Sequence, residues 1–545
     1  MKNRTLYFGD NLDILRKSFP GSDGYFDLIY LDPPFNSNRN YNVLFKEEKI
    51  DSTAQIHAFE DSWHWGDEAQ SAYNLLVQKS NAEISDLIQA LQKIVGHNVV
   101  LAYLVMMTTR LIELHRVLKS TGSLYLHCDP TASHYLKIIL DTIFGKKNFR
   151  NEIIWKRSVP HNDAQKFGTQ HDVIFYYAKS DKYKWYPQYK PLSASYINNF
   201  YKNKDKDGRV YQLTSVTAPG GRGPKYEFLG VTRYWRYTEE KMKRLYKDGL
   251  IIQTQPGTVP RFKRYLDKQS GVTLQDVWDD ILPIQGQSKE YMGYPTQKPE
   301  VLLERIIQAS TKEGDWVLDP FCGCGTTVSV AERLKRNWVG IDISMLAINL
   351  IQGRLSTRFK GRGLKNKILV DGEPKDVASA KKIFEMDPYN FEYWALHLVN
   401  AMPAKGKTKE NMKGADKGID GIITFLKSTQ KGTDEYGKII VQIKGGHVQR
   451  NQIATLKGDV EREKADGGLF VTLEEPTKPM KHEAVLAGKF KTSYSLVEFP
   501  KIQIMTVKDL LDNKKPELPF GSKDPYHKTA EELKEENENQ TEMPL

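Results

Sequence analysis

Cysteine is scarce in this sequence, which contains three cysteines in 545 residues. Three thiols cannot form a disulfide framework, so we expect a fold held by apolar burial and a reducing, cytoplasmic setting. Long apolar runs are also missing. The longest, such as residues 101–107, are far too short to cross a bilayer, and the start MKNRTLYFGDN is too polar for a signal peptide. We therefore expect neither a membrane protein nor a secreted one.

The charge balance lies on the positive side. Lys and Arg number 79 against 68 Asp and Glu, which gives a net charge of +11 and a pI of about 9.0. This excess suits an anionic partner such as nucleic acid, although composition alone does not separate that partner from a membrane surface. The chain exceeds one ordinary domain, so we expect about three, and its hydrophobic content of 39% is typical of globular proteins.

Apolar runs of strand length alternate with helical periods in the first part of the chain and again after residue 295. The predicted strands span residues 5–8, 25–31, 123–127, 151–155, 316–318 and 337–343. The predicted helices span residues 11–19, 98–118, 133–144, 300–310 and 326–334. This alternation indicates an α/β fold with a parallel, doubly wound, Rossmann-like sheet. Residues 32–70 are predicted to be a loop.

Two of the predicted strands end in the same way, with an acid, a proline and then a loop. Asp32-Pro33-Pro34-Phe35 follows the apolar run 26–31, and the sequence DPFCGCGTT of residues 319–327 follows the run 316–318. Ligands of open α/β sheets bind at the carboxyl ends of the strands, where such loops lie. The two segments together therefore predict one site.

The glycine loop of residues 319–327 lies between a strand and a helix, and the next strand ends at Asp342. Glycines let the backbone approach a ligand, and an acid at that place can hold ribose hydroxyls. The loop lacks the lysine of phosphate binders, while Asp319 suits an ammonium or sulfonium group. This favours S-adenosylmethionine over NAD or ATP. Cys322 and Cys324 fit no common zinc spacing, so no metal is expected there.

The DPPF segment suits a reaction at an exocyclic amine of a base. Such an amine is a poor nucleophile, because its lone pair is delocalised into the ring. Asp32 and the carbonyl of Pro33 can accept its two hydrogens, and the ring of Pro34 helps to keep both acceptors aimed. Phe35 offers a face for a flipped-out base. A Pro-Pro turn after a strand is common by itself, and the glycine loop is what favours the catalytic interpretation.

Residues 181–290 differ in composition from the segments around them. They contain 20 Lys and Arg against 12 Asp and Glu, together with 17 aromatic residues. Basic and aromatic residues interleave in KMKRLYK at 241–247 and in RFKRY at 261–265. Cations attract phosphates and aromatic faces stack on bases, so this region is predicted to contact DNA. A solvated, tyrosine-rich insertion is the alternative.

These motifs resemble those of the β-class amino DNA methyltransferases, over about residues 1–355. Residues 32–35 match the catalytic motif of the family, and residues 319–327 its cofactor motif. Residues 294–299 (YPTQKP) and Gly9-Asp10-Asn11 match two further motifs near the cofactor. The resemblance implies an S-adenosylmethionine-dependent methyltransferase sheet that acts on a flipped-out base in double-stranded DNA. The cofactor-binding residues that it implies are Asp10, Thr296, Lys298, Asp319, Phe321, Gly323, Gly325, Thr326 and Asp342.

The order of the motifs, with the catalytic motif first, is the permuted order of that class. The stretches 126–135 and 151–155 resemble the subgroup close to type III modification subunits. In that layout residues 181–290 are the target-recognition region. DPPF favours adenine N6 as the methylated atom, with cytosine N4 as the alternative. His127 and Asp129 are expected to be structural, since the amine can lose its proton after the attack.

A second candidate site lies near the C-terminus. Residues 421–425 and 439–444 are predicted to form a hairpin that places Gln442 and Lys444 on one face, with Asp420 at the end of the partner strand. An acid and an acceptor can hold Mg²⁺ while a lysine orients water, and Glu392 on a predicted helix can reach the same metal. We therefore predict Asp420 and Gln442 as metal ligands, and Asp420, Gln442, Lys444 and Glu392 as catalytic residues.

This second site resembles the Mrr-like branch of the PD-(D/E)xK nucleases. Glutamine stands where the superfamily usually has glutamate, which removes a negative charge from the metal site. An active Mg²⁺-dependent restriction endonuclease and an inactive fold that only binds DNA therefore both remain open. A third alternative is a non-enzymatic DNA-binding protein on a dead methyltransferase scaffold.

The predicted domain order follows from these motifs. Residues 1–180 form a catalytic half, 181–290 the target-recognition insertion, and 291–356 the cofactor-binding half. Residues 357–386 are a predicted linker, 387–511 a smaller α/β restriction-endonuclease-like domain, and 512–545 a disordered tail. The recognition sequence is not readable from one chain, and a homodimer is left open.

Overall fold

The computed structural model describes most of the chain up to residue 519. The residues outside the description are 23, 35–39, 46–53, 61–64, 160–166, 286–287, 289, 293, 295, 360–362, 365–366, 405–417, 431–432, 494, 496 and 520–545. The chain divides into two compact units. The first combines Met1–Tyr186 with Asp276–Leu545, and the second is Pro187–Gln275.

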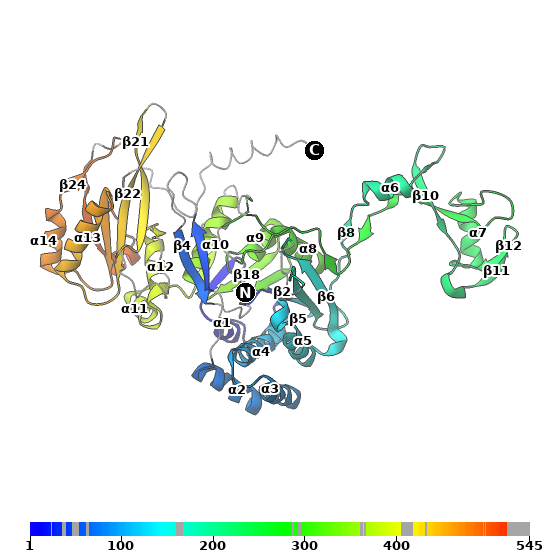
Figure 1. Ribbon diagram of the computed structural model, residues 1–545, viewed down its shortest axis with the longest axis horizontal. Helices are drawn as coiled ribbons and strands as arrows, with labels where there is room; N and C mark the ends of the chain where they lie inside the picture. Colours follow the sequence, from blue (N-terminus) through cyan, green and yellow to red (C-terminus); the bar gives the residue numbers. More distant parts are fainter. Residues whose placement is uncertain are drawn as a thin grey trace. The chain divides into compact units, whose positions relative to one another are not determined.

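A nine-stranded sheet, built from strands between residues 5 and 371, is the centre of the larger α/β part of the first unit (Figure 1). Its order is β16-β6-β7-β5-β2-β17-β18-β1-β19. The strands are β1 (Thr5–Phe8), β2 (Phe26–Leu31), β5 (Leu118–Cys128), β6 (Phe149–Lys156), β7 (His171–Ala178), β16 (Val277–Trp278), β17 (Trp316–Asp319), β18 (Asn337–Asp342) and β19 (Leu369–Asp371). The neighbours are parallel except β7, which runs antiparallel to β5 and β6. The predicted parallel, doubly wound arrangement thus holds, and the pairs that β7 makes with β5 and β6 are its antiparallel part.

Helices cover both faces of this sheet. They are α1 (Asn11–Ser18), α2 (Asp67–Lys79), α3 (Ala82–Val95), α4 (Val99–Val117), α5 (Pro130–Phe144), α8 (Glu300–Ser310), α9 (Thr326–Arg333) and α10 (Met345–Arg358), with a 3-10 turn at Lys146–Asn148. Along β2, Ile29 packs in the cluster of α1, α3, α4 and α5, while Tyr30 packs in the cluster of α8, α9 and α10. Successive strand residues point to opposite faces, so this alternation produces a doubly wound sheet.

Two segments have more structure than the sequence predicts. The predicted loop of residues 32–70 contains an antiparallel hairpin of β3 (Asn40–Phe45) and β4 (Ala54–Glu60). The predicted linker of residues 357–386 contains β19, which is parallel to β1, and helix α11 (Val377–Met386). A three-residue strand is too short to show a period of its own, so its place in the sheet is a tertiary effect. Most of the predicted tail lies outside the described residues.

The unit Pro187–Gln275 has a small core of its own. Val216, Phe228, Trp235, Met242 and Ile251 are buried in it. Its elements are β8 (Tyr189–Lys190), α6 (Ala194–Phe200), β9 (Asn203–Lys204), β10 (Val210–Ser215), β11 (Lys225–Phe228), β12 (Val231–Tyr234), α7 (Glu239–Lys247), β13 (Ile251–Ile252), β14 (Arg261–Tyr265) and β15 (Val272–Thr273), with 3-10 turns at Pro219–Gly221 and Leu266–Lys268. The main sheet has the order β13-β14-β10-β9.

A five-stranded sheet forms the C-terminal α/β part, in the order β20-β21-β22-β23-β26. Its strands are β20 (Met402–Pro403), β21 (Gly421–Gln430), β22 (Thr433–Lys444), β23 (Gly467–Thr472) and β26 (Ile502–Thr506), and β24 (Lys489–Phe490) pairs separately with β25 (Phe499–Pro500). The helices are α11, α12 (Pro388–Leu398), α13 (Arg450–Arg462), α14 (Lys478–Leu486) and α15 (Val507–Leu511). None of the helices in the described ranges has both the length and the apolar character that crossing a membrane requires.

Candidate functional site

The predicted site residues of the first sheet lie along one edge. Strands β2, β17, β18 and β1 are consecutive parallel neighbours, so their carboxyl ends share that edge. Asp319 and Asp342 end β17 and β18, Asp32 follows β2, and Asp10 follows β1. The fold thus brings four acids from distant parts of the chain to the edge where ligands of such sheets bind.

Asp32 has one oxygen engaged and one without a partner. Its Oδ2 accepts a hydrogen bond from Nζ of Lys298, and the same Nζ donates to the carbonyl of Thr296 at 3.2 Å. Its Oδ1 is buried and has no hydrogen-bond partner among the described residues. A buried acceptor without a donor is costly and calls for an explanation, such as a ligand donor. Pro33 is buried and Pro34 is half-buried, while Phe35 lies outside the described residues.

The glycine loop begins at Asp319, whose Oδ1 accepts the backbone N–H of Phe321 at 3.1 Å. The loop closes with a bond of 2.7 Å from Gly325 N to the carbonyl of Cys322. Gly325 has a φ of +76°, and a Cβ there would lie 2.6 Å from the side chain of Ile351. Glycine is therefore required at this position by both its backbone conformation and its surroundings.

Asp342 ties the glycine loop to the following helix. Its Oδ2 accepts the N–H of Gly323 at 2.8 Å, and its Oδ1 accepts that of Ser344 at 2.8 Å. An ionised carboxylate has about four lone-pair sites, so both oxygens keep acceptor capacity for hydroxyl groups. Gly9 N donates to the carbonyl of Asp342 at 3.0 Å, which joins the ends of β1 and β18.

Two of the acids at this edge, Asp319 and Asp342, have raised pKa values. Burial, reinforced by the nearby charges of Asp32 and Asp342, raises the pKa of Asp319 to about 7. Burial raises the pKa of Asp342 to about 6. Each shift reflects the cost of a negative charge that is removed from water without a nearby cation of its own. A positively charged ligand would relieve this cost.

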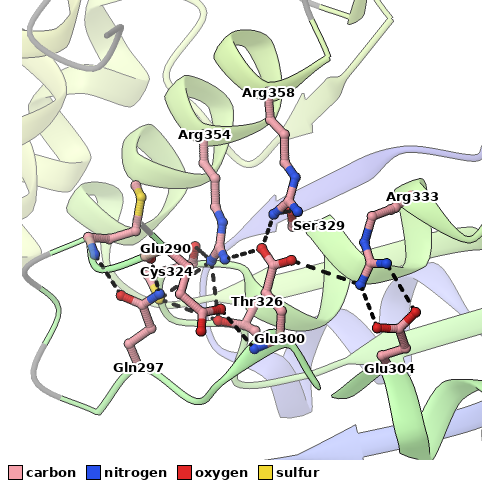
Figure 2. A network of polar contacts seen from close by, with 11 residues as sticks. Glu290, Gln297, Glu300, Glu304, Cys324, Thr326, Ser329, Arg333, Arg354 and Arg358 are labelled. Atoms are coloured by element: carbon pink, nitrogen blue, oxygen red, sulfur yellow. Dashed lines mark hydrogen bonds and ion pairs between the residues drawn. The ribbon is translucent and has the colours of Figure 1, made fainter. Parts of the chain in front are cut away.

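A buried arginine supports the glycine loop from the side of α10 (Figure 2). Nη1 of Arg354 donates to the carbonyl of Cys324 at 3.1 Å and to the hydroxyl of Thr326 at 3.2 Å, while Nη2 donates to Oε1 of Glu300 at 2.8 Å. Although burial alone would raise the pKa of Glu300, Arg354 and Arg358 hold it below its ordinary value. The pair therefore stays ionised and fixes the backbone of the loop.

Asp10 and Asn11 place the end of β1 against the glycine loop. Asp10 caps α1 through the N–H of Leu12 at 2.8 Å and pairs with Arg110. Nδ2 of Asn11 donates to the carbonyl of Pro320 at 2.8 Å. The carboxylate of Asp10 thus supports the structure, and Asn11 is the residue of this motif that contacts the loop. Sequence reasoning missed Asn11, Arg110 and Arg354, of which only Asn11 lay inside a recognised motif.

A buried polar chain links β2, β5 and β7. Nδ1 of His127 is 2.9 Å from the hydroxyl of Tyr30, and its Nε2 is 3.1 Å from Oδ2 of Asp172. His127 is fully buried, and Asp129 caps α5 through the N–H of Thr131 at 3.1 Å. Both residues therefore have structural contacts that account for their positions.

The second candidate site lies at the end of β22. Asp420 is buried directly before β21, and its Oδ2 accepts the N–H of Ile443. Gln442 is buried, whereas Lys444 on the same face of the strand is half-buried. The structure thus brings Asp420, Gln442 and Lys444 together.

Glu392 comes from the other side of this sheet. Helix α12 packs in the cluster that contains Val441 and Ile443, whereas α13 packs in the cluster that contains Ile440. Gln442 points to the same face as Ile440, because strand side chains alternate. The contribution of Glu392 to a metal site therefore remains a prediction without support from the helix that carries it.

A family model described as DNA methylase matches residues 26–353, which include both motifs of the first sheet. The chain belongs to the DNA methylase family. A second family model, described as restriction endonuclease, matches residues 383–506. The C-terminal α/β part therefore has the Mrr-like fold that the sequence motifs suggest.

Two curated relatives are similar to this chain over about half of its length or more. The type II methyltransferase M.EcaI of Enterobacter cloacae is 34% identical over 262 residues, which cover 47% of this chain and 58% of the relative. The StyLTI Mod subunit of a type III restriction-modification enzyme of Salmonella typhimurium is 28% identical over 346 residues, which cover 60% of this chain and 49% of the relative. The chain thus spans about half the length of these relatives.

Two of the solved structures that are similar to this chain have a low sequence identity and a low TM-score. The complex of M1.HpyAVI with S-adenosylmethionine is 16% identical, covers 64% of this chain and 99% of that chain, and has a TM-score of 0.30. The cytosine-N4-specific PvuII DNA methyltransferase is 13% identical, covers 68% of this chain and 96% of that chain, and has a TM-score of 0.32.

Proposed function

We propose that this protein transfers a methyl group from S-adenosylmethionine to N6 of adenine in double-stranded DNA. The observation that carries the proposal is Oδ1 of Asp32, a buried acceptor with no partner among the described residues. It lies at the sheet edge that also presents the glycine loop and Asp342. An amine hydrogen of a flipped-out base is the donor that such an oxygen suits.

The residues of this edge fit the proposed cofactor. Asp342 keeps acceptor capacity for two ribose hydroxyls, and the elevated pKa of Asp319 suits a cationic partner. Gly323 and Gly325 let the ligand approach the backbone, Phe321 and Thr326 belong to the same loop, and Thr296 and Lys298 border it. When it is bound, S-adenosylmethionine supplies an electrophilic methyl group at this edge.

The protein's own contribution to the reaction is orientation. Asp32 and the carbonyl of Pro33 accept the two hydrogens of the amine, which localises the nitrogen lone pair and aims it in line with the methyl group. Methyl transfer would leave the positive charge of the sulfonium on the nitrogen. The amine then loses a proton to solvent, so no base is needed before the attack. Lys298 binds Oδ2 of Asp32, which leaves Oδ1 for a hydrogen of the amine.

Product analysis of methylated DNA tests this reaction. Purified protein, S-adenosylmethionine and plasmid DNA should yield N6-methyladenine by mass spectrometry of the digested nucleosides. Finding N4-methylcytosine alone would overturn the choice of base. Finding no methylation on DNA from several sources would overturn the proposal that the protein is a DNA methyltransferase.

We also propose that residues 387–511 cleave DNA with Mg²⁺ at Asp420, Gln442 and Lys444. The support is the placement of these three residues at one end of β22. Asp420 and Gln442 offer hard oxygen ligands, and Lys444 can stabilise the developing phosphate charge. Glu392 is retained only as the weaker candidate for this site.

Plasmid cleavage tests the second activity. The intact protein with Mg²⁺ or Mn²⁺ should cut either unmethylated or methylated plasmid, and Lys444→Ala should remove cutting while methyl transfer is retained. The two centres share no residue, so the two activities should be separable. If neither substrate is cut while methylation is fully active, the C-terminal part is a DNA clamp.

A further inference from the structure

The amide nitrogen of Gln442 is held by two acceptors. Its Nε2 donates to the carbonyl of Gly418 and, at 3.1 Å, to Oδ2 of Asp459 on α13. Its Oε1 has no hydrogen-bond partner among the described residues. Asp459 is buried to all but 3% of its surface, and its other oxygen, Oδ1, lies 2.7 Å from Nη1 of Arg462.

These contacts decide which end of the amide is the nitrogen. A carbonyl and a carboxylate are both acceptors, so only the NH₂ end can face them. The oxygen end must then point the other way, and an amide oxygen is a hard ligand of the kind that Mg²⁺ prefers. We propose that Asp459 is a positioning residue that presents Oε1 of Gln442 to a divalent cation bound with Asp420, an inference that rests on the proposed nuclease function.

The surroundings of Gln442 are built for an amide rather than for a carboxylate. A glutamate at this position would direct a negative charge at Asp459 and at the carbonyl of Gly418. Gly418 has a φ of +69°, and a Cβ there would lie 3.1 Å from Nε2 of Gln442, so the glycine permits the close approach. Glutamine is therefore a fitted part of the site and not the remnant of a lost glutamate.

The donor set fits a magnesium-type site. In the described ranges no three His, Cys, Asp or Glu side chains cluster as a metal site. Mg²⁺ is typically held by one or two carboxylates and keeps several waters. Asp420 and Oε1 of Gln442 meet that requirement, with Asp459 acting on the metal only through Gln442. Mutation of such an outer partner typically costs about 10–100-fold in metal affinity.

Mn²⁺ titration of the full-length protein tests the proposal, with calorimetry and the electron paramagnetic resonance of free Mn²⁺ as readouts. The site in question is the one that Asp420→Asn removes. Asp459→Asn should weaken Mn²⁺ binding at that site by about tenfold, since an asparagine can also donate to Oε1 and no longer fixes the amide. Asp466→Asn is the matched control, because Asp466 accepts the N–H of Lys438 at 3.0 Å and pairs with Lys427 in the same domain.

A charge exchange gives the decisive comparison. Gln442→Glu, which adds a negative charge to the site, should nevertheless weaken Mn²⁺ binding and lower the thermal unfolding temperature. Adding Asp459→Asn to Gln442→Glu should restore both, because an amide then donates to the new carboxylate. Tighter Mn²⁺ binding by Gln442→Glu alone, or unchanged binding by Asp459→Asn, would overturn the role of Asp459. The absence of any Mn²⁺ site sensitive to Asp420→Asn would instead overturn the nuclease proposal, and the role of Asp459 with it.

Discussion

At the scale of single residues, the four acids at the carboxyl ends of β2, β17, β18 and β1 have different surroundings. Asp32 pairs with Lys298 and has one oxygen without a partner among the described residues, Asp342 accepts two backbone N–H groups, and Asp319 is buried in the loop. Asp10 is occupied by its helix cap and by Arg110. In the proposed function the same residue type would thus bind a base, a ribose or a cation, or support the fold, according to what surrounds it.

Replacing Asp32 should impair methylation, whereas replacing Asp342 should impair cofactor binding. Asp32→Ala should lower methylation by about 10²–10³-fold, the range for the removal of a preorganised partner, with S-adenosylmethionine affinity nearly unchanged. Asp342→Asn should weaken cofactor binding by about 10–100-fold, since it replaces a charged acceptor. Calorimetric titration and initial methylation rates measure both. An equal drop in cofactor affinity in the two variants would contradict this division of roles.

Cofactor affinity should depend on pH through Asp319. Its pKa of about 7 in the free protein means that it is partly protonated near neutrality, and a cationic ligand favours the ionised form. S-adenosylmethionine binding should therefore be constant above about pH 8 and weaken as the pH falls through 7. S-adenosylhomocysteine, which lacks the sulfonium charge, is the control and should show a smaller change. Equal pH profiles for the two ligands, measured by titration, would refute the assignment of Asp319.

At the scale of elements, three helices converge behind the glycine loop (Figure 2). Glu300 begins α8, Thr326 begins α9, and Arg354 lies on α10. Arg354 reaches both other helices and the carbonyl of Cys324 in one buried cluster. The loop is thus held by a contact between elements, in addition to the bonds within the loop and the freedom of its glycines.

Arg354→Lys should weaken cofactor binding although it keeps the charge. A lysine cannot donate to Cys324, Thr326 and Glu300 in the fixed fork of a guanidinium, so we expect S-adenosylmethionine affinity to fall by about tenfold. Arg333→Lys is the matched control, since Arg333 bonds Glu304 at 3.0 and 3.1 Å and lies 4.0 Å from Glu300 in the same network (Figure 2). If cofactor affinity falls as much in Arg333→Lys as in Arg354→Lys, the loss is due to packing in general and not to the contacts of Arg354 with the loop.

At the scale of the whole molecule, positive charge is concentrated in a unit with its own core. In Pro187–Gln275, Lys243 pairs with Glu239 and Lys263 with Asp205, at 2.7 and 3.0 Å. Lys241, Arg244 and Lys247 on α7 are exposed and form no ion pair with any described residue. The unpaired cations are the ones available to phosphates, so they are predicted to hold the DNA.

Replacing Lys241, Arg244 and Lys247 together by alanine should weaken DNA binding and flatten its dependence on salt. Removing one cation that neutralises a phosphate should reduce the slope of log K against log salt by about 1. Lys243→Ala, which removes a cation that is already paired with Glu239, is the control and should change the slope little. Fluorescence anisotropy over a salt series measures this, and an unchanged slope in the triple variant would refute the role of α7.

The sequence by itself determined the strands that carry the site and the chemistry of their ends. The apolar runs at β2, β17 and β18, and the acid, proline and glycine residues that follow them, are local signals that need no partner. Residues 421–425 and 439–444 were likewise predicted as a hairpin from their alternation and the turn between them. The structure also has a hairpin there, formed by β21 and β22.

Only the tertiary structure decided the contacts between distant residues. Lys298 meets Asp32 across 266 positions of the chain, and Asp459 meets Gln442 from a helix on the face of the sheet. The tertiary structure likewise decided the direction of β7 and the place of β19 in the sheet. Such contacts depend on how helices and strands pack against one another. They produce no periodic pattern in the sequence, because each partner alone is an ordinary polar residue or a short strand.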